Sequence, residues 1–283
     1  GAVHAAQGRL VSVSSALGCG ARVALDRPER AAHLPRRCRQ SGPPARDAAS
    51  RPNRKGLAVM KRLEQECAQL DAEGKPWIQT FSGRAFPVGD PKPSDFTLID
   101  IGSHLSRLNR YTGAIQPEFY SVAEHSVRVA YYLRALVARE LGTNDVHVLT
   151  AAFRAGLMHD AHEAYLNDLN SPLKRYLLSI GADGYARLAE RYDEILRTRY
   201  GLSRFDSGEM GGRDLIREAD LSLLDLERPN VMGPPPRPWR DLGLLGKVAR
   251  PFPADPTFAR WGWNPNFARS AFMRAAARAG LSD

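Results

Sequence analysis

The stretch GLMHDAHEAYLNDLNSPLK, residues 156–174, places five ionisable side chains within ten positions. It follows a run from Val146 to Met158 in which nearly every residue is apolar or small, a pattern typical of a buried helix. A buried helix that ends in several charged groups needs partners for them, because unpaired charges are costly to bury. A divalent metal ion is the simplest partner, so we expect the chemistry of the protein to lie here. The five side chains are His159, Asp160, His162, Glu163 and Asp168.

The rest of the chain from Met60 has mainly the apolar spacing of helices. Residues 77–88, WIQTFSGRAFPV, combine aromatic and β-branched residues around a Ser82-Gly83 turn and predict a small hairpin. No strand and helix alternation and no internal repeat is visible, so we predict an all-α fold with this minor N-terminal hairpin. The predicted helices cover residues 60–73, 96–110, 122–141, 144–163, 172–180, 184–200 and 212–228, and a final Ala-rich helix follows residue 265.

The positive charge of the chain is concentrated in its first 59 residues. All 283 residues carry a formal charge of +9, and residues 1–59 alone carry +8, from eleven Lys or Arg and three Asp or Glu. The remaining 29 basic and 28 acidic residues nearly cancel, so we expect no nucleic acid polymer as a partner. No apolar run is long enough to cross a bilayer, and the three cysteines form no even framework. We therefore expect a soluble, cytoplasmic protein without a membrane partner.

Residues 1–59 lack a sustained hydrophobic period and are rich in Ala, Arg, Ser and Pro, so we predict that they are disordered. Their Arg-rich, acid-poor composition also fits an organellar transit peptide. The segment opens with Gly, however, and the first methionine of the chain is Met60. We favour Met60 as the natural start, with the leader an artefact of cloning or gene prediction, and we place the folded domain at residues 60–283.

Two further candidate ligands come from other predicted helices. His125 lies near an apolar face, where a lone histidine is more often a core or boundary residue than a ligand. Asp220 lies in an apolar helix, where a buried carboxylate needs a cation or strong donors, and a salt bridge to an arginine would also satisfy it. Each is weak evidence alone. The hypothesis of a metal site rests on four residues in order: His125, His159, Asp160 and Asp220.

Three blocks of this sequence together resemble the HD-domain metallophosphohydrolases, and within them the YfbR-like 5'-deoxynucleotidases and related phage deoxynucleotide phosphohydrolases. Arg110-Tyr111 precedes His125 by fifteen positions, and Glu163 follows His159 by four, a spacing that marks this subgroup. The resemblance covers roughly residues 77–228 and implies an HD-domain helical bundle. The sequence beyond it, from about residue 229, predicts a Pro-rich and helical C-terminal extension of the domain. The blocks are RYTGAIQPEFYSVAEHS (110–126), HDAHEAYLNDLNSPLK (159–174) and EADLSLLDLE (218–227).

The resemblance also implies a reaction. Two imidazoles and two carboxylates would hold one divalent transition metal, Mn²⁺, Co²⁺, Zn²⁺ or Fe²⁺, and leave positions open for water and a phosphate oxygen. Such an ion lowers the pKa of bound water, so no nucleophilic side chain is required. Glu163 would orient or deprotonate the attacking water, although a helix-end acid also pairs with nearby bases. Asp168 would hold the sugar hydroxyl or assist the leaving group, although Asp also caps loops.

The remaining likenesses concern the substrate. Arg110 is the candidate phosphate clamp, because a guanidinium binds phosphate oxygens bidentately, although an arginine at a helix end also satisfies terminal carbonyls. Tyr111 would flank the sugar or base, or belong to the core, and Lys174 would add charge near the phosphate or lie in solvent. Two positions depart from the pattern: Tyr111 stands where the relatives carry Trp, and His162 occupies a usually small or polar position. Both bear on substrate choice more than on the reaction.

We therefore expect metal-dependent hydrolysis of nucleotide 5'-phosphates, first of all deoxynucleoside 5'-monophosphates. Two alternatives remain open: hydrolysis of deoxynucleoside triphosphates with release of triphosphate or pyrophosphate, and a catalytically silent nucleotide-sensing module. The presence of Glu163 and Asp168 beside the ligands argues against the silent module. Dinuclear HD oxygenases need further histidines downstream, and none follows His162, so we expect one ion. Helical HD proteins of this kind often associate, and we expect a homo-oligomer.

Overall fold

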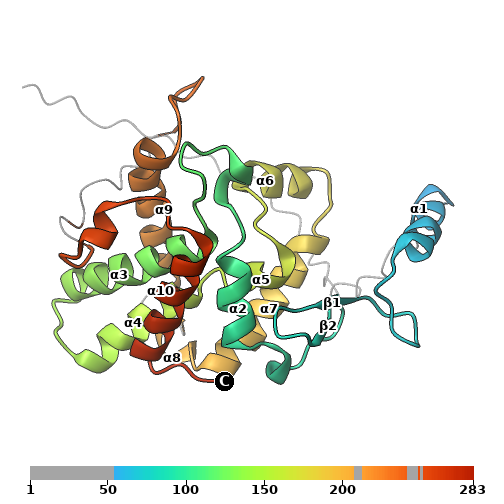
Figure 1. The fold of residues 1–283 in the computed structure, drawn as a ribbon, viewed down its shortest axis with the longest axis horizontal. Helices are drawn as coiled ribbons and strands as arrows, with labels where there is room; N and C mark the ends of the chain where they lie inside the picture. Colours follow the sequence, from blue (N-terminus) through green and yellow to red (C-terminus); the bar gives the residue numbers. More distant parts are fainter. Residues whose placement is uncertain (1–53, 207–211, 241–247, 249–250) are drawn as a thin grey trace, which may run out of the picture. The chain divides into compact units, whose positions relative to one another are not determined.

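The computed structural model describes residues 54–206, 212–240, 248 and 251–283. Of the leader predicted at residues 1–59, residues 1–53 therefore lie outside the described residues. The described chain is mostly helical with one two-stranded antiparallel sheet, which confirms the predicted mainly-α class (Figure 1). The α-helices are α1 (Arg54–Glu66), α2 (Leu98–Leu105), α3 (Val122–Glu140), α4 (Val146–Met158), α5 (Glu163–Leu166), α6 (Ser171–Ser179), α7 (Gly184–Tyr200), α8 (Ser203–Asp206), α9 (Gly212–Val231) and α10 (Pro265–Arg278).

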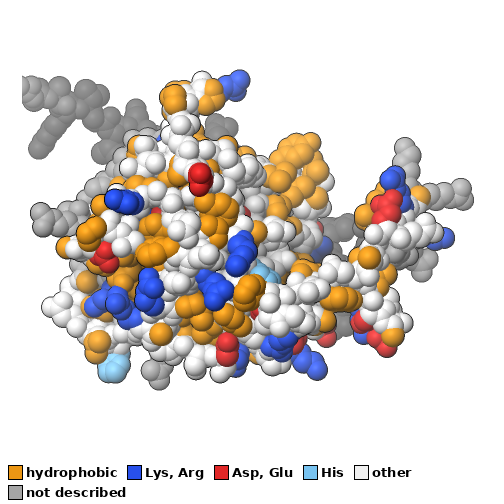
Figure 2. Space-filling model, in the orientation of Figure 1, with side chains coloured by type: hydrophobic (Ala, Val, Ile, Leu, Met, Phe, Trp, Pro, Cys, Tyr) orange, Lys and Arg blue, Asp and Glu red, His pale blue; other side chains and the backbone are white. Residues whose placement is uncertain are grey.

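In the part of the chain that the structure describes, no helix combines the length and the apolar character needed to cross a membrane. On the face shown in Figure 2, Lys and Arg side chains lie in separate groups among hydrophobic and uncharged ones.

Contacts divide the chain into residues 1–56 and 57–283, and every site residue considered below belongs to the second unit.

The hairpin lies where the sequence predicts it. Strand β1 (Trp77–Gln79) pairs antiparallel with β2 (Ala85–Pro87), and Gly83 in the turn has a φ of 83°, a conformation that favours glycine. The turn is attached to α2, because Asp100 accepts hydrogen bonds from the Ser82 amide at 2.7 Å and the Ser82 hydroxyl at 2.9 Å. The hairpin is therefore part of the core of the helical unit.

Helix α3 is central to the arrangement that positions the site, since it packs against α4, α9 and α10 (Figure 1). The contact with α4 is closest at Gly156, where an added Cβ would lie 2.9 Å from the Cα of Ala130. Only a residue without a side chain allows two helix backbones to approach so closely. This close approach brings His159, three residues after Gly156, next to His125 on α3.

Several predicted boundaries are wrong. Helix α1 begins at Arg54 and ends at Glu66, so residues 54–59, predicted to be disordered, are helical and residues 67–73 are not. The helix predicted over 96–110 is shorter, and the one predicted over 144–163 ends at Met158. A short 3-10 turn, Arg110–Gly113, follows α2 after a break, and the four-residue α5 begins at Glu163.

Described parts of the C-terminal segment pack into the core of the helical unit. Helix α9 continues through Pro229 to Val231, whereas the sequence predicts a stop at residue 228. Further on, Glu124 of α3 accepts hydrogen bonds from the backbone amides of Trp263 at 2.6 Å and Gly262 at 3.3 Å. Helix α10 then packs on α2 and α3, and Phe272 is fully buried.

Candidate metal centre

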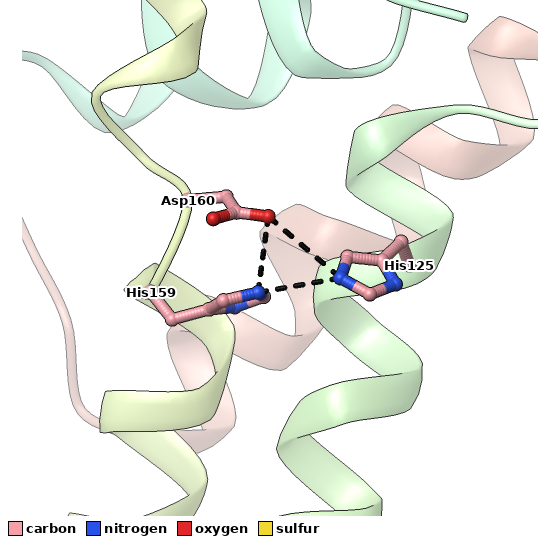
Figure 3. Close-up of side chains that lie close together, drawn as sticks. All are labelled: His125, His159 and Asp160. Carbon is pink, nitrogen blue, oxygen red and sulfur yellow. Dashed lines mark hydrogen bonds and ion pairs between the residues drawn. The ribbon is translucent and has the colours of Figure 1, made fainter. Parts of the chain in front are cut away.

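Three side chains from two helix segments point toward one another at the centre of the bundle (Figure 3). His125 belongs to α3, while His159 and Asp160 follow directly after the last residue of α4. The two Nε2 atoms are 3.3 Å apart, and Asp160 Oδ2 lies 3.0 Å from His159 Nε2 and 3.7 Å from His125 Nε2. All three ligand atoms lie within 4.8 Å of one another.

Asp220 of α9 supplies a fourth donor atom to the same point. Its Oδ1 lies 3.1 Å from His125 Nε2 and 4.0 Å from His159 Nε2. Two ligands at right angles around an ion with bonds of about 2.1 Å are roughly 3.0 Å apart, and two opposite ligands are roughly 4.2 Å apart. The separations among His125, His159 and Asp160 therefore fit one shared ion, and the distances from Asp220 to the two histidines fall in the same range.

The hydrogen bonds of the two histidines orient both rings toward the same point. Glu227 Oε1 lies 2.6 Å from His125 Nδ1, and the backbone oxygen of Gly156 lies 2.8 Å from His159 Nδ1. Both oxygens only accept hydrogen bonds, so each Nδ1 donates, and each ring that loses its Nε2 proton directs a lone pair of Nε2 at its neighbour. Two converging lone pairs repel unless a cation lies between them, which is the arrangement of metal-binding histidines with their supporting acceptors.

The charges around this point also favour a cation. Burial disfavours the charged form of His159, yet the neighbouring carboxylates of Asp160 and Asp220 raise its pKa to about 9. Burial likewise opposes ionisation of Asp160, but the pKa of its carboxyl lies well below the usual range because His159 and His125 are so close. A divalent ion satisfies the same negative field, and the donor set of two imidazoles and two carboxylates suits Mn²⁺, Co²⁺, Zn²⁺ or Fe²⁺.

Glu227 supports this centre and is the residue that the sequence prediction missed. It is fully buried on α9 and accepts hydrogen bonds from His125, from the Tyr120 hydroxyl at 2.7 Å and from the Tyr111 hydroxyl. Although burial raises a carboxyl pKa, Arg110 and His125 lower that of Glu227 to about 2. It follows Asp220 by seven residues, or two helical turns, so both side chains lie on the same face of the helix. This spacing is the sequence signal that could have identified Glu227.

A cavity of about 270 Å³ adjoins the centre. Glu163 is almost completely buried in its wall: Lys174 Nζ donates to Oε1 at 3.1 Å, while Oε2 has no hydrogen-bond partner among the described residues. Burial and the nearby carboxylates of Asp160 and Asp168 raise the pKa of Glu163 to about 9. Burial raises the pKa of Asp168 as well. The predicted residues that line this cavity are Arg110, Tyr111, Asp160, Glu163, Asp168, Lys174 and Asp220.

Three of the predicted residues differ from expectation in their local structure or their contacts. Arg110 is not at a helix end but opens the 3-10 turn, and its Nη1 lies 3.8 Å from Asp160 Oδ2. Tyr111 has a φ of 55° and lines the cavity. Its hydroxyl donates a hydrogen bond to Glu227, so it also supports the centre. His162 is not brought to the centre, because its Nδ1 pairs with Asp193 at 2.9 Å.

Fold and site define a mainly helical protein with a candidate His/Asp metal centre beside a charged cavity. No family model matches the chain. It is 36% identical over 168 residues to the uncharacterized protein YfdR of Escherichia coli K12, a match covering 59% of this chain and 73% of YfdR. It is 33% identical over 161 residues to the uncharacterized protein RCAP_rcc00048 of Rhodobacter capsulatus, covering 56% of this chain and 74% of that protein. The chain therefore belongs to the family of these two uncharacterized proteins.

Proposed function

We propose that the protein is a metal-dependent phosphohydrolase of the HD-domain type that acts on nucleotide 5'-phosphates, first of all deoxynucleoside 5'-monophosphates. The convergence of His125, His159 and Asp160 within 4.8 Å, beside a cavity with partly buried basic groups, is the observation that carries the proposal. The residues that would hold the ion are His125, His159, Asp160 and Asp220. When bound, the ion supplies an acidified water and offsets charge on the attacked phosphoryl group.

The cavity wall contains the cations that a phosphate ester needs. The side chain of Arg110 is only 12% exposed, and its Nε lacks a hydrogen-bond partner among the described residues although Glu227 lies 3.5 Å away. Guanidinium groups bind phosphate oxygens through several donors at fixed geometry, and Lys174 adds a second positive charge to the wall. These two side chains would bind and orient the phosphate.

Glu163 is the group placed to exchange a proton. Lys174 fixes one of its oxygens, and the other is buried in the wall without a partner among the described residues. A carboxyl held in this way can orient the attacking water, and its raised pKa suits donation of a proton to the leaving group. Asp168, which lines the same cavity, would bind a sugar hydroxyl or assist departure of the leaving group.

Metal analysis of the purified protein, combined with a nucleotide panel that resolves phosphate, pyrophosphate and triphosphate products, tests the proposal. Asp160→Ala is expected to lose both the ion and turnover. Glu163→Ala is expected to keep the ion and lose roughly 10²–10⁴-fold in kcat, the usual contribution of general acid–base catalysis. Glu194→Ala, at an exposed position on α7, is the control for removal of a carboxylate. Full activity in metal-free Asp160→Ala protein would refute the mechanism, and release of triphosphate would redirect the proposal to deoxynucleoside triphosphates.

A further inference from the structure

The cavity beside the metal centre has an apolar part that the hydrolytic residues do not explain. Its lining includes Leu224 of α9, Pro172 of α6 and Trp239. Trp239 follows α9 and lies beyond residue 228, where the sequence resemblance ends. A phosphate group binds to positive charges and hydrogen-bond donors rather than to the face of an indole ring. This part of the cavity is therefore suited to another part of the substrate.

Trp239 also lines a larger neighbouring groove of about 680 Å³, so its ring stands between the groove and the cavity. The Arg228 guanidinium lies 5.0 Å from the centre of this ring, and Arg228 lines the groove but not the cavity. The guanidinium therefore packs on Trp239 from the side of the groove. The part of Trp239 that lines the cavity is thus not covered by Arg228.

Trp239 is 39% exposed, and the Arg228 side chain that restrains its ring is itself held by an ion pair. Arg228 Nη2 donates to Asp225 Oδ1 at 2.6 Å, and the Asp225 side chain is almost fully buried. Both residues lie on α9, the helix that carries Asp220 and Glu227. One helix thus holds a metal ligand, the residue that supports His125, and the ion pair that stacks on Trp239. A restrained ring loses little conformational freedom when a planar group stacks on it.

We propose that Trp239 is the surface on which the base of a nucleotide stacks while its 5'-phosphate lies at the metal centre. This inference rests on the proposed function and adds a residue that would bind the base, so that nucleotides are preferred to base-free sugar phosphates. Every nucleobase has a π-face, so stacking on an indole favours the presence of a base without selecting one base over another.

Kinetics on two kinds of substrate test the role of Trp239. With the four deoxynucleoside 5'-monophosphates, Trp239→Ala is expected to raise KM roughly tenfold, because stacking on an aromatic side chain contributes about 1–3 kcal/mol per base. With 2-deoxyribose 5-phosphate, the same variant is expected to equal the wild type. Trp239→Phe is expected to restore most of the affinity for nucleotides. Tyr176→Ala, which removes another exposed aromatic ring, on α6, is the matched control.

A binding measurement separates failure of this inference from failure of the proposed function. In Mn²⁺-loaded Glu163→Ala protein, a deoxynucleoside 5'-monophosphate is expected to quench tryptophan fluorescence saturably, and the quenching is expected to disappear when Trp239→Phe is added. Because this titration needs no turnover, it decides the role of Trp239 even if wild-type protein hydrolyses neither substrate, a result that would remove the proposed function alone. Unchanged quenching in the double variant, or an equal loss by Trp239→Ala on nucleotides and on 2-deoxyribose 5-phosphate, would overturn the stacking role.

Discussion

Glu227→Gln removes one negative charge from the buried network behind the metal centre and keeps the size of the side chain. In the wild type, His125 and two tyrosine hydroxyls donate to the two Glu227 oxygens, and Arg110 Nε lies 3.5 Å away. In the variant, an amide that donates hydrogen bonds must replace one of these acceptors, and Arg110 loses its nearer carboxylate, with Asp160 left at 3.8 Å. Removing one partner of a buried ion pair destabilises a protein by about 3–5 kcal/mol.

The pKa of Glu227 gives a second, consistent magnitude. Lowering a carboxyl pKa from 4.5 to about 2 corresponds to roughly 3 kcal/mol of stability at neutral pH. We therefore expect the metal-free variant to lose about 3 kcal/mol, which lowers the Tm by about 6–12 °C in a unit of this size. Since the folded pKa lies below the unfolded one, the contribution is full above about pH 5 and disappears as the pH falls toward 2. The difference between variant and wild type should shrink accordingly in acid.

Thermal unfolding from pH 3 to 7 and titration with Mn²⁺ measure the two effects of Glu227→Gln separately. Loss of a residue that orients a metal-bound histidine typically weakens metal affinity by about 10–100-fold. Glu118→Gln, the same chemical change at an exposed position, is expected to alter neither quantity. A Glu227→Gln protein with the Tm of the wild type and a metal affinity within twofold of it would refute this account of the network.

Three further substitutions test other parts of the architecture. Gly156→Ala is expected to destabilise the protein by about 1–3 kcal/mol and to weaken Mn²⁺ binding, because the new methyl group forces α4 away from α3. Thermal unfolding measures the loss, and Gly184→Ala is the control, because no atom lies within 4 Å of the added methyl group there. Arg128→Leu leaves the buried Glu124 carboxylate without its guanidinium, so urea denaturation should show a loss of about 3–5 kcal/mol. Tyr111→Phe removes one donor to Glu227, and calorimetry should show a loss of about 1 kcal/mol with the metal retained.

The apolar spacing of the sequence predicts the interiors of the long helices better than their ends. Helix α7 has the predicted bounds, and α3 ends one residue earlier than predicted. The helix predicted to reach residue 163 ends at Met158 because the polar groups after it are satisfied by the site rather than by a helical face. Tyr111 and Thr112 adopt φ values of 55° and 54°, which no propensity scale predicts for non-glycine residues.

In the candidate site, too, some residues could be predicted from the sequence and one depends on tertiary contacts. The prediction that His125, His159, Asp160 and Asp220 lie together required three helices to pack in one way, and their donor atoms do converge. Glu227 was missed because an acid near the end of an amphipathic helix is ordinarily solvent-exposed. Only the approach of α3 and the Arg110 turn converts it into a fully buried partner of His125.

Adjacent residues on α3 perform two separate tasks. His125 faces the candidate ion, and Glu124 holds the amides of Gly262 and Trp263. We expect an ion bound at His125 to stabilise this turn of α3 and so to slow local opening of the contacts that Glu124 makes with Gly262 and Trp263. Hydrogen exchange at Trp263 would report on the ion from the opposite side of α3.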